Sequence, residues 1–161
     1  MARSIKLSLE TNRSLPKVLI IDDSELFGSR LKELLSDIQS VEVLAQARSA
    51  KEGLAVLEMS DPDIIFLDIQ LPDASGATIL PIIREVKPKV SVIVLSNLDT
   101  DLQKLLFPRS GGDYYLDKSK GIFKIPEIIN KIINAEQVPE TIFPLQGRAN
   151  SYYKNVVATA G

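Results

Sequence analysis

Five short apolar runs, each followed by a segment of helical periodicity, constrain the fold of this chain more than any other feature. The runs are dominated by Val, Ile and Leu, and they occupy residues 17–22, 41–47, 63–69, 91–96 and 113–117. Continuous apolar strands of this kind are typical of a parallel sheet that helices cover on both faces. Because the strands alternate with helices, the sequence predicts an α/β, doubly wound fold built on a five-stranded parallel sheet.

The intervening segments have apolar residues at helical spacing, with capping residues and prolines near their ends. Ser24 is placed to cap the first helix, and Pro126 lies in the first turn of the last one. Pro81 would break a helix that began at Gly76, so we expect the third helix to start with Thr78 as its N-cap. The predicted helices span residues 24–38, 49–59, 78–86, 99–107 and 126–137.

Composition narrows the possible functions. The 161 residues are 45% apolar and 25% charged, which suits one globular domain with modest extensions. A formal charge of −2 gives no sign of a nucleic-acid-binding surface, and no apolar run approaches the roughly 20 residues of a membrane span. We therefore expect a cytoplasmic protein. The chain has no Cys and no His, which excludes thiolate and histidine chemistry on the chain itself.

Groups able to do chemistry stand at the ends of the predicted strands. Taken singly, each has an ordinary role, since an Asp after a strand is commonly a turn former or helix cap and a Lys is commonly solvated. Parallel strands, however, bring their carboxyl ends to one edge, where ligands of such sheets bind. Every predicted strand except the second ends in such a group, namely Asp22-Asp23, Asp68, Ser96-Asn97 and Lys118.

Three carboxylates at one edge require a compensating charge. Two carboxylates about 4 Å apart repel by about 4 kcal/mol at an effective dielectric constant of 20. With only oxygen ligands in the cluster, the cation that fits best is Mg²⁺. A divalent cation beside a carboxylate, with a Lys and a Ser opposite, is an arrangement suited to phosphoryl transfer.

Four motifs carry a family resemblance. "VLIIDDSE", "DIIFLDIQLPDASG", "VIVLSN" and "GGDYYLDKS" together resemble the receiver domain of two-component response regulators, over roughly residues 17–137. The resemblance implies a flavodoxin-like sheet with strand order 2-1-3-4-5. It also implies a stand-alone, chemotaxis-regulator-like signalling protein, which is not an enzyme beyond its own phosphorylation and dephosphorylation.

The resemblance also implies roles for individual residues. Asp68 would accept a phosphoryl group from a sensor histidine kinase or a histidine phosphotransfer protein. Mg²⁺ would be held by Asp22, Asp23, Asp68 and the backbone carbonyl of Gln70.

The remaining implied roles concern the phosphoryl group and the switch. Ser96 and Lys118 would bind the phosphoryl group, and Tyr115 would change rotamer together with Ser96. Asn97 stands where the family often has Ala or Gly, so its side chain would either crowd the phosphoryl pocket or hydrogen-bond within it.

The two ends of the chain lie outside the resemblance. Residues 1–16 form an N-terminal extension in which apolar Ile5, Leu7 and Leu9 alternate with polar residues, a strand pattern. We expect residues 138–161 to form a tail with no output domain, either disordered or docked on the domain or a partner. The expected partners are the phosphodonor and a downstream protein target. A homodimer through the fourth helix, fifth strand and fifth helix is a further expectation.

Two other functions remain open from the sequence. The first is a receiver fold that serves as a binding module without phosphorylation. The second is a haloacid-dehalogenase-like phosphatase, which resembles this chain in its Asp nucleophile and Mg²⁺. Those enzymes have an Asp-x-Asp motif, and here Gln70 takes the place of the second acid.

Overall fold

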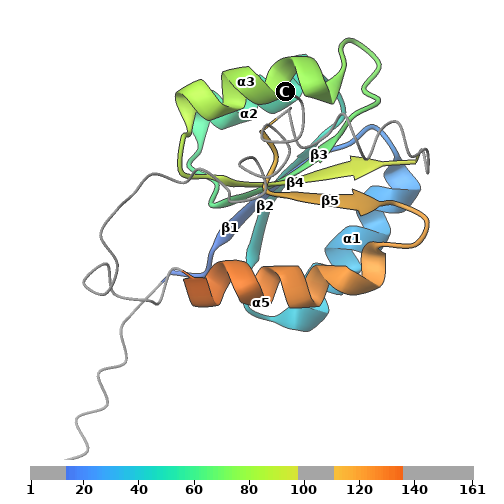
Figure 1. Ribbon diagram of the computed structural model, residues 1–161, viewed down its shortest axis with the longest axis vertical. Coiled ribbons are helices and arrows are strands. Elements are labelled where there is room, and N and C mark those ends of the chain that lie inside the picture. The colour runs from blue at the N-terminus through green and yellow to red at the C-terminus, as the bar shows by residue number, and fades with distance from the viewer. Residues whose placement is uncertain (1–13, 98–110, 136–161) are drawn as a thin grey trace, which may run out of the picture.

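The strands form one parallel sheet, as the sequence predicts. The computed structural model describes residues 14–97 and 111–135. Within them the sheet has five strands in the order β2-β1-β3-β4-β5 (Figure 1). This order confirms the doubly wound, flavodoxin-like fold. The strands are β1 (Lys17–Ile21), β2 (Glu42–Ala47), β3 (Ile64–Asp68), β4 (Ser91–Ser96) and β5 (Tyr114–Asp117).

Helices cover both faces of this sheet. One face carries α1 and α5, and the other carries α2 and α3 (Figure 1). The predicted fourth helix, 99–107, lies outside the described residues, as do the N-terminal extension up to residue 13 and the tail from residue 136. The described helices are α1 (Glu25–Ile38), α2 (Ala50–Met59), α3 (Gly76–Val86), the 3₁₀ helix η2 (Ile122–Lys124) and α5 (Ile125–Ala135).

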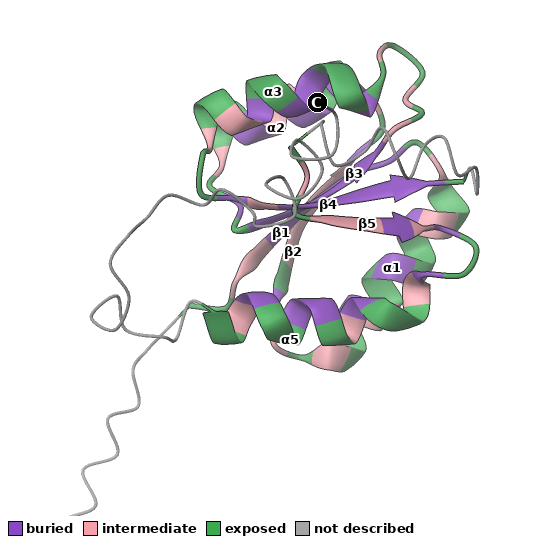
Figure 2. Cartoon of the chain, in the orientation of Figure 1, coloured by how far each residue is buried: buried purple, intermediate pink, exposed green. Residues whose placement is uncertain are grey.

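The centre of the sheet is buried on both faces. Every residue of β3 is buried, and β3 and β4 are almost wholly purple in Figure 2. Phe66 and Ile64 pack with α1 and α5, whereas Ile65 and Leu67 pack with α2 and α3. Each such side chain contributes about 1.5–3 kcal/mol on burial. The strand that ends in Asp68 is therefore among the most firmly held parts of the molecule.

The start of α3 differs from the prediction. The helix begins at Gly76, with the Ser75 hydroxyl accepting the Ala77 N–H at 3.2 Å, so Thr78 is not the cap and Pro81 lies inside the helix. Proline removes the hydrogen bond to the carbonyl four residues earlier. Both Pro81 and Ala77 are exposed, so water can hydrate that carbonyl. The prediction was wrong because it treated an interior proline as excluded even on a solvent-facing side.

Contacts of the β3–α3 loop account for this early start. Gln70 and Ser75 form an isolated antiparallel bridge, and the Gly76 N–H donates to the Ile69 carbonyl at 2.8 Å. At the loop's tip, the Asp73 carboxylate accepts the N–H groups of Ala50 and Lys51 at 2.8 and 2.9 Å. The loop is thus fastened both to itself and to the N-terminus of α2. These contacts restrict the conformation of the backbone that follows Asp68.

Candidate functional site

Three carboxylates meet at the carboxyl end of the sheet. Asp22 and Asp23 follow β1, and Asp68 is the last residue of the neighbouring strand β3. Asp22 is 0% and Asp68 2% exposed, whereas Asp23 is exposed. Each of them offers an oxygen atom, and these atoms lie within 4.8 Å of one another. The convergence expected from the parallel topology is therefore present, with Asp23 on the solvent side.

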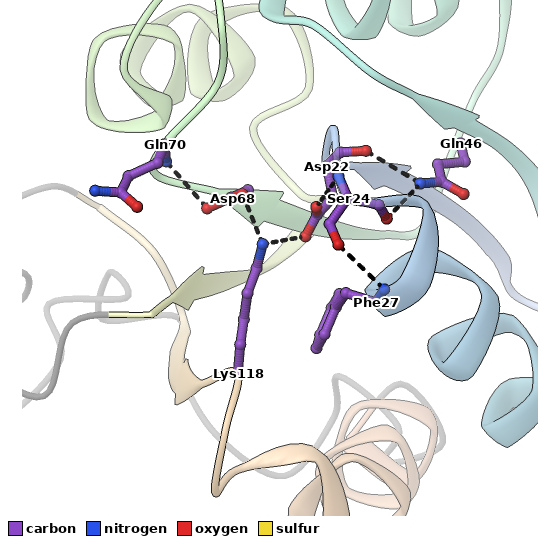
Figure 3. Close-up of polar contacts among 7 residues, drawn as sticks. All are labelled: Asp22, Ser24, Phe27, Gln46, Asp68, Gln70 and Lys118. Carbon is purple, nitrogen blue, oxygen red and sulfur yellow. Dashed lines mark hydrogen bonds and ion pairs between the residues drawn. The ribbon is translucent and has the colours of Figure 1, made fainter.

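Lys118 lies between the two buried acids (Figure 3). Its Nζ is 2.6 Å from Asp22 Oδ2 and 2.6 Å from Asp68 Oδ2. The ammonium also stands 4.9 Å from the centre of the Phe27 ring, at the distance of a cation–π contact. Burial opposes the charge of Lys118, but its close contacts with the carboxylates of Asp22 and Asp68 outweigh this, and the pKa of Lys118 lies above its ordinary value. It is therefore an ammonium at neutral pH.

Asp22 is held by several hydrogen bonds, but one of its carboxylate oxygens accepts none. Its Oδ1 accepts the Ser24 N–H at 2.8 Å, and its own N–H donates to the Ala47 carbonyl at 2.9 Å. Its Oδ2 is buried and accepts no hydrogen bond of good geometry, so the ion pair with Lys118 is its contact within the described residues. Burial raises the pKa of Asp22, although Lys118 and the Ser24 N–H pull in the opposite direction. A cation at Oδ2 would remove this penalty.

The charges and donor atoms of the cluster fit Mg²⁺. Three carboxylates face a single ammonium, which leaves the cluster with an excess of negative charge. The donors are all oxygen atoms, and Asp22 Oδ2 is buried without a hydrogen bond. Hard divalent cations with oxygen ligands match such a site. The acidic pocket is therefore compatible with Mg²⁺.

The two carboxylate oxygens of Asp68 have different hydrogen-bond donors. Oδ1 accepts the N–H of Gln70 at 3.0 Å, and Oδ2 accepts from Lys118 at 2.6 Å. Gly76 packs against the Asp68 backbone so closely that a Cβ there would lie 2.2 Å from the Asp68 carbonyl oxygen. Gln70 thus contacts Asp68 through its backbone N–H. The metal-ligand role of its carbonyl stays a prediction.

The three residues expected to sense the phosphoryl group occupy different environments. Ser96 ends β4 and is 7% exposed, and its carbonyl accepts the Lys118 N–H at 2.8 Å. Asn97 is exposed. Tyr115 is half-buried beside the apolar cluster of α2 and α3, and its hydroxyl accepts the Gly112 N–H at 3.1 Å. Ser96 thus borders the acids, while Tyr115 is fastened toward the beginning of its own strand.

Gln46 is a contact of the site that the sequence did not predict. From β2 its Nε2 donates to the carbonyl of Asp22 at 3.1 Å and to that of Ser24 at 3.3 Å (Figure 3). The second strand was the one expected to bring no group to the site. No local spacing marks Gln46, because its part depends on how β2 is aligned with β1. Only knowledge of that alignment could have found it.

This fold and this acidic edge define a receiver domain, and comparison with known proteins agrees. The family model described as "Response regulator receiver domain" matches residues 18–132, so the chain belongs to that family. Protein-glutamate methylesterase/protein-glutamine glutaminase 3 of Rhodospirillum rubrum is 46% identical over 90 residues, covering 56% of this chain and 24% of that protein.

Two further similarities cover more of the chain. The response regulator protein VraR of Staphylococcus epidermidis is 26% identical over 134 residues, covering 82% of this chain and 64% of that protein. The chain therefore spans less than two thirds of the length of these curated relatives. A CheY-like receiver domain protein from Methanospirillum hungatei JF-1 superposes with a TM-score of 0.68 at 27% identity, covering 77% of this chain and 98% of that structure.

None of the described helices combines the length and the hydropathy that a membrane-spanning helix needs.

Proposed function

We propose that this chain is a phospho-accepting response regulator in which Asp68 takes a phosphoryl group from a histidine kinase or histidine phosphotransfer protein. The observation that carries the proposal is the buried cluster of Asp22, Asp68 and Lys118, with Asp23 at its rim. Burying two acids against one ammonium carries a large desolvation cost, and clusters that bear such a cost are typical of functional sites. Its place at the carboxyl end of the sheet is where ligands of this fold bind.

In the proposed reaction, one Asp68 oxygen attacks the phosphorus of a phosphohistidine on the donor protein. A P–O bond forms, the P–N bond breaks, and the leaving imidazole takes up a proton. Mg²⁺, when bound, neutralises the phosphoryl oxygens. Asp22, Asp23 and the Gln70 carbonyl would hold the cation. Lys118 already contacts Asp68 at 2.6 Å, so its ammonium can follow the new negative charge onto the phosphoryl group.

The proposed switch connects this charge to the far side of β5. An aspartyl phosphate adds negative charge and acceptor oxygens beside Ser96, whose hydroxyl would bond to it. Tyr115 would then turn toward Ser96, which requires breaking the bond from the Gly112 N–H to its hydroxyl. The exposed side chain of Asn97 would meet the phosphoryl group from the rim and set its lifetime. The surface of β5 and α5 would change as a result.

The proposal extends to partners and boundaries. The receiver unit would span residues 17–137, act in the cytoplasm and signal to a downstream protein target. A homodimer would use β5, α5 and the predicted fourth helix. The 161 residues contain no histidine, which supports a phosphoryl donor outside this sequence.

Phosphorylation of Asp68 by a small donor tests the proposal. Wild type and Asp68→Asn are incubated with acetyl phosphate and MgCl₂, and intact mass spectrometry follows the gain of one phosphoryl group. We expect the gain in wild type and its loss in Asp68→Asn or in EDTA. Equal phosphorylation of both proteins would contradict the assignment of Asp68.

A second measurement separates the proposal from the two other functions considered above. If wild type responds neither to acetyl phosphate nor to beryllofluoride with Mg²⁺, the chain is a binding module. Sustained hydrolysis of a generic phosphate ester would instead indicate a phosphatase.

A further inference from the structure

We infer that Gln46 is a positioning residue that fixes the acid pair after β1 and thereby sets the affinity of the site for Mg²⁺. The inference rests on the function proposed above for Asp22 and Asp23. Gln46 lies on the edge strand β2, and its amide nitrogen donates to two backbone carbonyls, those of Asp22 and Ser24. These carbonyls flank Asp23.

The alignment of β2 with β1 is what aims Gln46 at this loop. Val18 pairs with Val43, but Leu19 pairs with Ala45, so Leu44 is an extra residue that forms a β-bulge. The shift pairs Gln46 with Ile20, whose side chain packs on the α1 and α5 face. Gln46 therefore points toward the start of α1. A regular strand would have turned it to the opposite face, because side chains alternate.

The amide of Gln46 occupies a space left by Gly28 of α1. A Cβ on Gly28 would lie 2.2 Å from Gln46 Nε2 and 2.4 Å from its Cδ. Glycine inside a helix is ordinarily less stable than alanine. The glycine therefore makes room for an amide that bonds to the loop. Because the atoms in conflict are the end of a flexible side chain, alanine at this position would displace the amide and leave the backbone in place.

The loop needs this support because strand pairing ends before it. The Asp22 N–H still bonds to the Ala47 carbonyl at 2.9 Å, continuing the ladder by one step. Beyond it, Ser24 caps α1 by accepting the Phe27 N–H at 3.2 Å. Within the described residues, the Asp23 carboxylate makes no hydrogen bond or ion pair, so the backbone alone places it. Gln46 holds that backbone on both sides of Asp23.

Two substitutions test the inference from opposite sides. Gln46→Met keeps the size of the side chain and removes the donor, while Gly28→Ala keeps the donor and takes its space. Isothermal calorimetry measures the Mg²⁺ dissociation constant of each variant and of the double variant. We expect each to weaken binding by about tenfold, the scale of groups that orient metal ligands. The double variant should lose no more than either single one.

Urea denaturation and a control substitution at a neighbouring residue distinguish a positioning effect from a general loss of stability. Gly28→Ala should stay close to wild type in urea stability, because the better helix propensity of alanine offsets the lost hydrogen bonds of Gln46, yet it should bind Mg²⁺ more weakly. Ser36 and Gln46 both line a groove between α1 and β2, but Ser36 lies about three turns along α1 from the loop, so Ser36→Ala should bind Mg²⁺ as wild type does. Wild-type affinity in both Gln46→Met and Gly28→Ala would overturn the inference.

Hydrogen exchange tests the positioning without relying on the metal. In Mg²⁺-free buffer, the N–H groups of Ser24 and Phe27 should exchange faster in Gln46→Met and Gly28→Ala than in wild type. Unchanged exchange would overturn the inference whether or not Mg²⁺ binds. If wild type fails to bind Mg²⁺ while exchange responds as expected, the proposed function fails and the positioning of the loop stands.

Discussion

Replacing Lys118 by methionine removes one ammonium from between two buried acids and changes the side-chain size little. At an effective dielectric constant of 20, each 2.6 Å contact corresponds to about 6 kcal/mol of attraction, most of which offsets the cost of burying the charges. The side chains of Lys118, Asp22 and Asp68 are 5%, 0% and 3% exposed, so solvent screens them little. Removing one partner of such a pair costs about 3–5 kcal/mol.

We therefore expect Lys118→Met to lower the free energy of unfolding by about 3–5 kcal/mol in EDTA, a large part of a typical domain's stability. Urea denaturation followed by circular dichroism measures the loss. Excess MgCl₂ should reduce the deficit, because the cation takes the place of the ammonium. At ten times its dissociation constant, Mg²⁺ stabilises any binding-competent fold by about 1.4 kcal/mol, and it binds the variant more tightly because Lys118 no longer competes.

Lys120→Met is the matched control for this experiment. It makes the same chemical change two residues further on, at an exposed position, and should alter stability by no more than about 0.5 kcal/mol. If Lys118→Met lowers the free energy of unfolding by less than about 1 kcal/mol, the ion pairs of Lys118 are no stronger than exposed ones, and the reasoning is refuted. A deficit of the same size with and without Mg²⁺ would refute the link between Lys118 and the cation.

Three further predictions follow from single contacts. Burial holds the pKa of Asp22 above its ordinary 3.8, so the folded state favours the protonated acid. In Mg²⁺-free buffer, wild type should therefore lose stability relative to Asp22→Asn as pH rises from 3.8 through the raised pKa. Urea midpoints across that pH range measure the loss, and parallel pH profiles of the two proteins would contradict it. Gly76→Ala places a Cβ 2.2 Å from the Asp68 carbonyl oxygen and should cost about 1–3 kcal/mol in urea denaturation, whereas a neutral result would show that the loop yields easily. Tyr115→Phe removes the bond from the Gly112 N–H, worth about 1 kcal/mol, so calorimetry should show about fivefold tighter binding of beryllofluoride with Mg²⁺; weaker binding would mean that the hydroxyl supports the activated state.

The sequence predicted what depends on burial and strand direction. Strand β3 is found as expected because a run such as Ile64–Leu67 is buried on both faces and leaves few alternatives. The meeting of Asp22 with Asp68 follows from the parallel topology alone, since adjacent parallel strands bring their carboxyl ends together. For the same reason Lys118 was expected at this edge.

What the sequence missed depends on contacts between distant segments. The early start of α3 reflects the Gln70–Ser75 bridge and the hydrogen bonds that Asp73 accepts from the N-terminus of α2. A rule based on local helix propensity takes neither contact into account. Gln46 was overlooked because a bulge at Leu44 determines which face of the sheet the Gln46 side chain lies on. In a strand this short, such a register shift cannot be recognised from the alternation of apolar and polar residues. That Lys118 forms ion pairs with both Asp22 and Asp68 likewise emerges only from side-chain geometry.

The ion pairs of Lys118 also bear on when the site comes into being during folding. Lys118 is 96 positions from Asp22 along the chain and 50 positions from Asp68. Contacts this distant in sequence carry a high entropic cost of loop closure and form after local helices. The cluster therefore exists only once β1, β3 and β5 have taken their places. A partly folded or truncated chain has the aspartate but lacks its surroundings, so competence for phosphoryl chemistry reports completion of the fold.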